Sequence, residues 1–424
     1  MVPAHAALAF LSLAPLFVFA VPPIWTQPEQ VHLSYAGVPN SMVVTWTTFK
    51  KTQSRVEYGL LGGRLFEMNA KGDATLFVDS GAEKRKMFIH RVTLTGLKPA
   101  ATYVYHCGGD DGWSDRFLFT ALNDSLGFSP RFAFYGDLGN ENPQSLARLQ
   151  KETQLGMYDV ILHIGNLYVD DNARVGDEFM RQIQSIAAYV PYMTCPGNHE
   201  AAYNFSNYRN RFSMPGQTES LWYSWNLGSA HIISFSTEVY FYLKYGKDLL
   251  FKQYEWLKND LEEANKPENR ALRPWIITMG HRPMYCSDDD QDDCTKFDSY
   301  VYIKPPAPGL EDLFYNYGVD LELWAHEHTY ERLWPVYGDK VYNGSTEQPY
   351  VNPKAPVHII TGSAGCRERT DRFNPNPKEW SAFRSRDYGY SRMRVVNATH
   401  LYLEQVSDDQ VSTHGRTGAQ AQLK

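Results

Sequence analysis

The sequence predicts two folded domains, an N-terminal all-β sandwich followed by a larger α/β domain. Between residues 28 and 122, short segments of alternating hydrophobicity are separated by turn residues at near-regular intervals, which is typical of a sandwich. After about residue 125, strand-like apolar runs alternate with segments of helical periodicity, which is typical of an α/β domain. The length of 424 residues also favours two domains.

The first domain is expected to contain six strands rich in β-branched and aromatic residues. They cover residues 31–35, 42–47, 54–58, 88–94, 102–106 and 116–120. Trp46 on an early strand, and Tyr103 at the start of a late one, resemble the core tryptophan and the tyrosine corner of fibronectin type III domains. We expect both aromatic side chains to pack in the core.

The second domain is expected to have a largely parallel central sheet with helices beside it. The predicted strands cover residues 131–135, 159–164, 192–194, 231–235, 275–279, 319–324 and 357–361, and the predicted helices 143–154, 176–188, 253–264 and 310–317. Residues that follow the strands are the candidates for a site, because ligands bind beyond the carboxyl ends of such strands. The polar tail, residues 407–424, is expected to be disordered.

The N-terminus is predicted to direct the chain into the secretory pathway. Residues 1–20 include the apolar run from Leu8 to Ala20 and are interpreted as a signal peptide. No later run is long and apolar enough to span a membrane, so we expect no membrane partner. We expect a secreted protein, either extracellular or in the secretory and lysosomal lumen. The same route fits four N-glycosylation sequons, at Asn123, Asn204, Asn343 and Asn397.

Charge and cysteine content narrow the classes of partner. The net charge of -7 is spread along the chain, which argues against a nucleic-acid surface and leaves room for a small phosphorylated substrate. The five cysteines show no C-x-x-C spacing, so a zinc ribbon is not expected. Cys286 and Cys294 flank an acidic loop and could close it as a disulfide. Nothing in the sequence indicates the oligomeric state.

Four predicted strands end in residues that bind metals. These residues are Asp137, Asn198 with His199, His281, and the pair His326 and His328. Each has an ordinary structural explanation, such as a helix cap, a turn or a core histidine. Four such endings at equivalent ends of one sheet instead favour a metal site, because imidazole and carboxylate are ligands of Zn, Fe and Mn.

The ligand types also indicate a chemistry. Nitrogen and oxygen ligands without thiolate suit two cations side by side, an arrangement used to hydrolyse phosphate esters. Two such cations lower the pKa of a bridging water and stabilise the charge of the in-line transition state. His199, next to Asn198, could protonate the leaving alkoxide.

These motifs resemble those of the purple acid phosphatases, of the larger plant-like type also found in animals. The family's G-D-x-G, G-N-H-[D/E], lone histidine and G-H-x-H motifs match Gly136–Gly139, Gly197–Glu200, Gly280–His281 and Ala325–His328, with alanine for the last glycine. The resemblance runs from the fibronectin-like domain through Val406. It implies a metallophosphoesterase domain of the calcineurin-like type at residues 129–406, built as a β-sandwich flanked by helices.

The resemblance also implies roles for the ligands. Asp137 and His328 would bind a ferric ion, and the three residues Asn198, His281 and His326 would bind a second, divalent metal, which is Fe, Zn or Mn in the family. His199 would contact the substrate phosphate or act as the acid. Glu327 would face solvent or stand outside the ligand set.

One family motif, G-D-x-x-Y, is absent. Its Asp bridges the two metals, and its Tyr binds the ferric ion and gives the purple colour. Here the strand at residues 159–164 is followed by Gly165-Asn-Leu-Tyr168. In a substitution account, Asn166 takes the bridging position, where a neutral amide is a poor bridge. In a deletion account, which we favour, the D-x-x-Y segment is gone, and Asp170 or Asp171 could replace the lost carboxylate.

Two functions follow as hypotheses. The leading one is a secreted acid phosphatase that hydrolyses phosphate monoesters with a dinuclear metal centre, impaired by the loss of the bridging Asp and the Tyr. The alternative is a glycoprotein without catalysis, a pseudo-phosphatase that acts as a binding module. Without the bridging carboxylate, two cations repel with one fewer anion between them, so binding of both is weakened.

Overall fold

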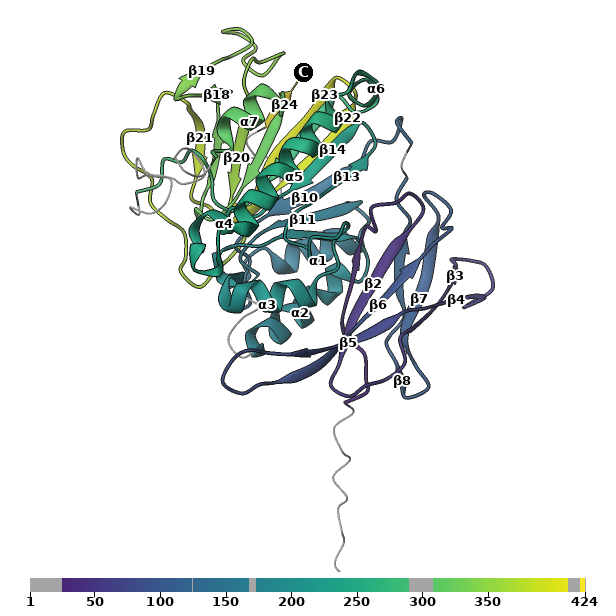
Figure 1. Cartoon of the computed structure of the whole chain (residues 1–424). Coiled ribbons are helices and arrows are strands. Elements are labelled where there is room, and N and C mark those ends of the chain that lie inside the picture. The colour runs from purple at the N-terminus through teal and green to yellow at the C-terminus, as the bar shows by residue number, and fades with distance from the viewer. Residues whose placement is uncertain (1–24, 124, 168–172, 290–307, 411–419, 424) are drawn as a thin grey trace, which may run out of the picture.

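The computed structural model describes residues 25–123, 125–167, 173–289, 308–410 and 420–423 (Figure 1). Within these ranges the chain forms two domains, as predicted from the sequence. The predicted signal peptide, Tyr168, Asp170, Asp171 and Cys294 lie outside the described residues.

The N-terminal domain is a sandwich of two antiparallel sheets. One sheet has the order β1 (Glu29–Ser34), β2 (Met42–Thr48), β6 (Lys86–Leu94) and β5 (Asp73–Val78); the other has β4 (Met68–Lys71), β3 (Arg55–Leu60), β7 (Thr102–Gly109) and β8 (Gly112–Trp113), with β9 (Phe117–Thr120) also paired to β7. The six predicted strands are all present. The sequence did not reveal β4, β5 and β8, because these strands are short or largely exposed and so lack a clear apolar face.

Both aromatic predictions in this domain are confirmed. Trp46 is fully buried and stacks on His90, with ring centroids 4.9 Å apart. The hydroxyl of Tyr103 accepts a hydrogen bond of 2.8 Å from the backbone amide of Lys98, which is the contact expected of a tyrosine corner.

The C-terminal domain contains two mixed sheets, which confirms the β-sandwich flanked by helices that the family resemblance implied, whereas the pattern of strands and helices alone had suggested one central sheet. The six-stranded sheet has the order β12 (Tyr192–Cys195), β11 (Val160–Ile164), β10 (Arg131–Tyr135), β22 (Gly389–Asn397), β23 (His400–Ser407) and β24 (Gln420–Leu423). The seven-stranded sheet has the order β13 (Tyr223–Leu227), β14 (Ala230–Ser234), β15 (Trp275–Met279), β16 (Leu321–Trp324), β20 (Val357–Thr361), β17 (Tyr330–Leu333) and β21 (Ser381–Ser385). In the seven-stranded sheet the predicted parallel strands lie inside and antiparallel strands complete both edges. In the six-stranded sheet the parallel strands β12, β11 and β10 form one half, with β12 at the edge, and antiparallel strands form the other half.

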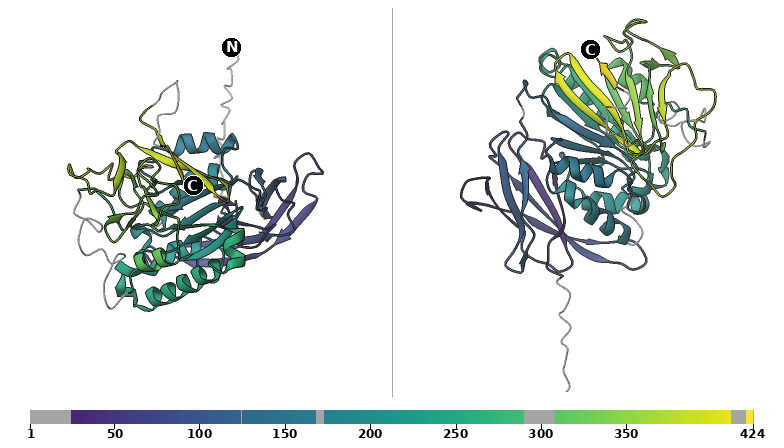
Figure 2. Two further views of the ribbon diagram at one scale, coloured as in Figure 1. Left: turned by 90° about the horizontal axis from the view of Figure 1, so that it is seen from above. Right: turned by 180° about the vertical axis from the view of Figure 1, so that it is seen from behind.

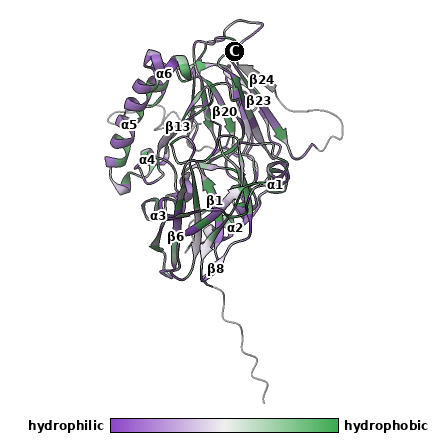
Figure 3. Ribbon diagram, turned by 90° about the vertical axis from the view of Figure 1, so that its right-hand side faces the viewer, coloured by the Kyte–Doolittle hydropathy of each residue, from purple (hydrophilic) through white to green (hydrophobic). Residues whose placement is uncertain are grey.

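Helices cover the outer sides of the paired sheets (Figure 2). The helices are α1 (Leu146–Gln154), α2 (Arg174–Ala187), α3 (Ala202–Arg211), α4 (Glu238–Phe241), α5 (Asp248–Ala264), α6 (Pro267–Leu272) and α7 (Glu311–Asn316). The four predicted helices correspond to α1, α2, α5 and α7. Figure 3 shows hydrophobic strands inside and a largely hydrophilic outer face on α5, as expected for a helix that covers a sheet. No helix among the described residues combines the length and apolarity needed to cross a bilayer.

The prediction of a disordered tail is wrong for its last segment. Residues 420–423 form β24, which pairs antiparallel with β23 between Leu401 and Glu404. Backbone groups of an edge strand are open to pairing whatever the side chains of the partner, so a polar sequence can still add a strand there.

The cysteines agree in part with expectation, because Cys286 is in a disulfide while Cys107, Cys195 and Cys366 carry free thiols.

A buried ion pair joins the two domains. Asp177 of α2 accepts hydrogen bonds from Arg211 of α3 at 2.9 Å and from Arg85 of the N-terminal domain at 2.6 Å. Gln30 of β1 also donates to Asp177, and Arg211 donates to the backbone carbonyl of Ala173 at 2.9 Å. Asp177 and Arg211 are almost completely shielded from water. The start of α2 is therefore fixed against the N-terminal domain.

We expect Asp177→Asn to destabilise the protein by roughly 3 kcal/mol, because it leaves buried guanidinium groups without their anion. The free energy of unfolding from urea titration measures this. The matched control is Glu83→Gln, which removes the exposed partner of Arg174 across the same domain boundary and should have little effect. Equal effects of the two substitutions would show that burial of the Asp177 pair does not matter.

A second prediction concerns acidic conditions. His90 is buried as a neutral ring, with one nitrogen bonded to the Thr48 hydroxyl and the other to the Ser54 hydroxyl, both at 2.8 Å. Burial lowers the pKa of His90 to about 4, below the value of about 6.5 in an unfolded chain. The unfolded state therefore binds the proton first, and stability present above pH 6.5 is lost as the pH falls towards 4.

By this linkage, His90 alone should remove about 2 kcal/mol of stability between pH 7 and pH 5. Urea unfolding at both pH values measures the loss. His90→Gln, which cannot be protonated, should unfold with a smaller pH dependence than the parent, whereas His400→Gln, at a half-exposed position, should not. Identical pH dependence for His90→Gln and the parent would rule out the assignment.

Candidate metal centre

The predicted ligands gather where strands of both sheets end. Asp137 follows β10 in one sheet, and Asn198 follows β12 in the same sheet. His281 follows β15 in the other sheet, and His326 and His328 follow β16. Backbone contacts join the two sheets here, since the amide of Gly136 donates to the carbonyl of Thr361 at 2.9 Å. The site therefore lies between the sheets, at the carboxyl ends of their parallel strands.

Two glycines, Gly165 and Gly197, leave the space that these ligands occupy. A Cβ on Gly165 would lie 2.4 Å from Nδ1 of His281, and a Cβ on Gly197 would lie 2.4 Å from Oδ1 of Asn166. Gly165 also has a φ of +78°, which favours glycine. Asp137 and His326 themselves have positive φ, at 57° and 71°, so the chain turns sharply as it leaves each strand.

One half of the site, which we call the asparagine subsite, consists of Asn198, His281 and His326. Nδ1 of His281 lies 3.0 Å from the carbonyl oxygen of Ile164, which can only accept, so Nδ1 carries the proton. Nε2 of a neutral His281 then presents a lone pair, and Oδ1 of Asn198 lies 2.9 Å away. Burial lowers the pKa of His281 to about 3, so at neutral pH Nε2 carries no proton that it could donate to Oδ1 of Asn198.

Two acceptors that face each other at this distance call for a cation. Ligand atoms about 2.1 Å from one ion and at a right angle are roughly 3 Å apart, which matches the separation of Asn198 and His281. The ring of His326 completes the subsite, with its centroid 5.0 Å from that of His281. The residues present thus fit a bound metal ion.

The other half, the aspartate subsite, consists of Asp137 and His328. Oδ1 of Asp137 lies 3.7 Å from Nε2 of His328, and Oδ2 accepts a hydrogen bond of 2.9 Å from the backbone amide of His326. Burial raises the pKa of Asp137, but the surrounding imidazoles, first among them His281, outweigh burial and hold the pKa at about 2. Burial opposes protonation of His328, yet the nearby carboxylate of Asp137 raises its pKa well above the usual range. A proton thus neutralises this pair in the absence of an ion.

Asn166 lies between the two halves. Its Nδ2 donates to Oδ1 of Asp137 at 2.6 Å, and its Oδ1 accepts from the backbone amide of His199 at 3.2 Å. Asn166 thus lies where the substitution account places it, while the residues after Leu167 that the deletion account concerns are outside the described part of the chain. Spacing along the chain could not reveal it, because the contacts that hold Asn166 come from the neighbouring strand end.

Glu200 fixes the backbone around Asn166. Its buried carboxylate accepts three backbone hydrogen bonds, from Asn166 and Leu167 at 2.9 Å and from Gly197 at 2.8 Å. Sequence reasoning placed Glu200 in a motif but gave it no role. Its fixed place directly after the asparagine and histidine of that motif was the available signal.

His199, which directly follows Asn198 in the chain, is half-buried. Burial lowers the pKa of its imidazole, while the carboxylate of Glu368 opposes that shift. Glu327 is fully buried, so the structure excludes the solvent-facing alternative for this residue.

Sequence reasoning missed Arg282, which stands beside the asparagine subsite. Its guanidinium donates to Nε2 of His326 at 3.1 Å and to the buried carboxylate of Glu238 at 3.1 Å. It lies 4.3 Å from the centroid of the Phe241 ring. Its position directly after His281 was the only sequence signal for this fixed positive charge.

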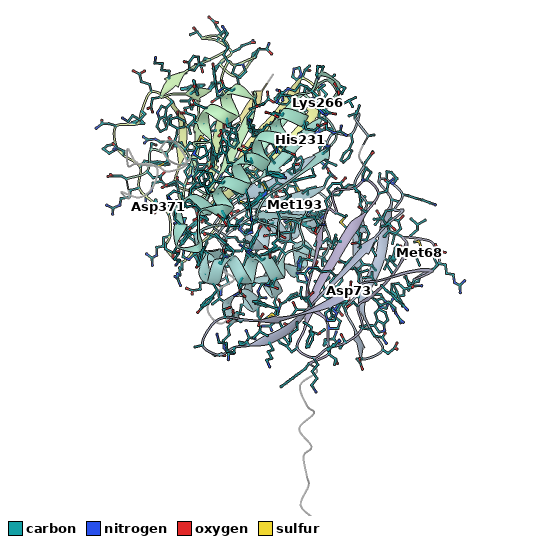
Figure 4. The ribbon with its side chains drawn as sticks, viewed as in Figure 1. Met68, Asp73, Met193, His231, Lys266 and Asp371 are labelled. Carbon is teal, nitrogen blue, oxygen red and sulfur yellow. The ribbon has the colours of Figure 1, made fainter. Side chains whose placement is uncertain are left out.

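The site lies away from the N-terminal domain. Asp371 accepts a hydrogen bond of 2.7 Å from the backbone of His328, and Figure 4 shows Asp371 on the opposite side of the molecule from Met68 of β4. The N-terminal domain therefore supports α2 and contributes none of the predicted ligands.

Comparison with known proteins identifies the domains. The family model described as purple acid phosphatase, N-terminal domain, matches residues 28–121. The model for calcineurin-like phosphoesterase matches residues 130–330, and that for iron/zinc purple acid phosphatase-like protein C matches residues 355–414.

Whole-chain relatives agree with these models. Acid phosphatase type 7 of Danio rerio is 73% identical over 402 residues, which are 93% of this chain and 91% of the zebrafish protein. The human protein of the same name is 59% identical over 388 residues, which are 90% of this chain and 88% of the human protein. The fold is also that of a purple acid phosphatase from yellow lupin seeds, with a TM-score of 0.77 and 24% identity over 92% of this chain and 73% of the lupin chain. The chain therefore belongs to the purple acid phosphatases of the animal type, a family of metal-dependent phosphomonoester hydrolases.

Proposed function

We propose that this chain is a secreted acid phosphatase whose hydrolysis of small phosphate monoesters is weakened by the residue at position 166. The observation that carries the proposal is the pair of facing acceptors on Asn198 and His281, which needs a cation in a site with His326 beside it. Asp137 and His328 stand ready for a second ion. Iron is the metal expected at the aspartate subsite, and Zn, Fe or Mn at the asparagine subsite.

Different residues of the site have different roles in the proposed hydrolysis. Bound metal ions would lower the pKa of a coordinated water and polarise the phosphoryl group. His199 is the group to protonate the leaving oxygen, because it stands next to Asn198 and is partly open to solvent. Arg282, held in place by Glu238, offers a fixed positive charge for a phosphoryl oxygen.

Asn166 explains the weakening. The five ligands carry a single negative charge, that of Asp137, to balance two cations. The amide of Asn166 adds no charge and already donates to Oδ1 of Asp137, an oxygen that an ion would need. We infer that the asparagine subsite binds its metal more tightly than the aspartate subsite does.

One observation favours the alternative, a pseudo-phosphatase that acts as a binding module. The hydrogen bond from Asn166 and the proton on His328 satisfy Asp137 without any metal. A chain that is stable in this state could keep the fold after losing catalysis.

Secretion and glycosylation remain part of the proposal. The sequon residues Asn343 and Asn397 are exposed, whereas Asn123 and Asn204 are half-buried. Exposure supports glycan attachment at the first pair.

The central experiment measures metal content and p-nitrophenyl phosphate hydrolysis on the purified chain. We expect one tightly bound metal ion and a second that is lost on dialysis, with turnover that rises when metal is added back. His281→Ala should remove both the tight ion and the turnover. A folded parent chain that holds no metal and hydrolyses no substrate would leave only the binding-module function.

Asn166→Asp should increase the metal content towards two ions per chain and raise turnover by at least about tenfold, the scale of metal-site substitutions. Without metal, two adjacent carboxylates repel, so this variant should melt below the parent and gain more from added Zn²⁺. The matched control is Asn69→Asp, which adds the same charge at an exposed position on β4. If the two variants behave alike, position 166 is not the cause of the weakening.

A further inference from the structure

Cys366 is a buried thiol beside the aspartate subsite. It follows β20, a parallel strand of the seven-stranded sheet, and so reaches the same edge of the domain as His326 and His328. The side chain is fully shielded from water, and Cys366 is one of the free cysteines. Candidate ligand atoms of Cys366, His328 and Glu368 all lie within 4.8 Å of one another.

We propose that Cys366 is a thiolate ligand of the metal ion held by Asp137 and His328. The proposal rests on the proposed function, because it takes the aspartate subsite to be a metal site. It adds a sulfur ligand that the five predicted ligands lack.

The geometry supports this assignment. A sulfur and an imidazole nitrogen on one tetrahedral zinc ion are roughly 3.5 Å apart, so an ion would close a gap of at most about 1.3 Å between Cys366 and His328. The thiol also lies 3.3 Å from the carbonyl of Arg369, a contact that an ion could replace at little cost because a thiol is a weak donor.

Charge balance points the same way. Asp137 is the only anion among the five predicted ligands, and Asn166 adds none. When the ion binds, the Cys366 thiol loses its proton to solvent and the resulting thiolate forms the metal bond, so the subsite gains a second negative charge. Glu368 is the weaker candidate, because it is exposed and already paired with Arg367 at 2.9 Å.

A thiolate ligand also changes which metals the subsite selects. Sulfur favours Zn²⁺, Fe²⁺ and Co²⁺, whereas Mn²⁺ and Mg²⁺ prefer oxygen. The aspartate subsite should therefore bind Zn²⁺ and Co²⁺ well and Mn²⁺ poorly.

The test titrates Co²⁺ into the metal-free full chain and follows the near-ultraviolet absorption of a thiolate bound to cobalt. We expect this band in the parent, in Cys107→Ser, which removes a thiol of the N-terminal domain, and in His281→Ala, which disables the other subsite. Cys366→Ser should lose the band and bind Zn²⁺ at least about tenfold more weakly at one site. Its Mn²⁺ affinity should stay close to that of the parent.

X-ray absorption at the zinc edge of the parent chain gives a readout that needs no variant. A sulfur neighbour at about 2.3 Å, beside nitrogen and oxygen at about 2.0–2.2 Å, is the expected result. If the parent loaded with two zinc ions per chain shows no sulfur neighbour, or Cys366→Ser keeps the band, the thiolate ligand is excluded while the metal site stands. If the parent binds no metal, the thiolate ligand and the proposed function both fail.

Discussion

The structure depends on one constraint, which is that parallel strands from two different sheets end at a common edge. The ends of β10 and β12 bring Asp137 and Asn198 from one sheet, and the ends of β15 and β16 bring the histidines from the other. Neither sheet alone holds a complete ligand set. The lone pairs of Asn198 and His281 face each other only because the two sheets pack together. The site therefore forms when the core of the domain forms.

Much of this could be predicted from the sequence, because each signal was local. Apolar runs gave the parallel strands, and the polar residue directly after each run gave Asp137, Asn198, His281 and the two histidines after β16. What could not be predicted is which distant segments of the chain lie next to each other. The strand β24 and the support from Glu200 depend on pairing between distant segments, which periodicity along one chain does not encode. The division into two sheets followed from the family resemblance and not from periodicity.

Asn166 shows the same limit within the site. The sequence showed that a carboxylate was missing and that two accounts could explain it. The contacts with Asp137 and the His199 backbone place Asn166 where the substitution account expects it. An amide can satisfy these neighbours in the absence of metal, which a carboxylate beside Asp137 could not do without repulsion. The residue that weakens metal binding therefore also stabilises the site in the absence of metal.

The ion pair between the domains has a consequence for how this site can evolve. The backbone amide of Leu167 donates to Glu200, and the carbonyl of Ala173 accepts from Arg211. Asp177, the partner of Arg211, is in turn bonded to the N-terminal domain. The contacts that fix Leu167 and Ala173 thus involve none of the five predicted metal ligands. Substitutions at those ligands can therefore change catalytic strength while the fold is preserved, because the N-terminal domain supplies an anchor that does not depend on metal.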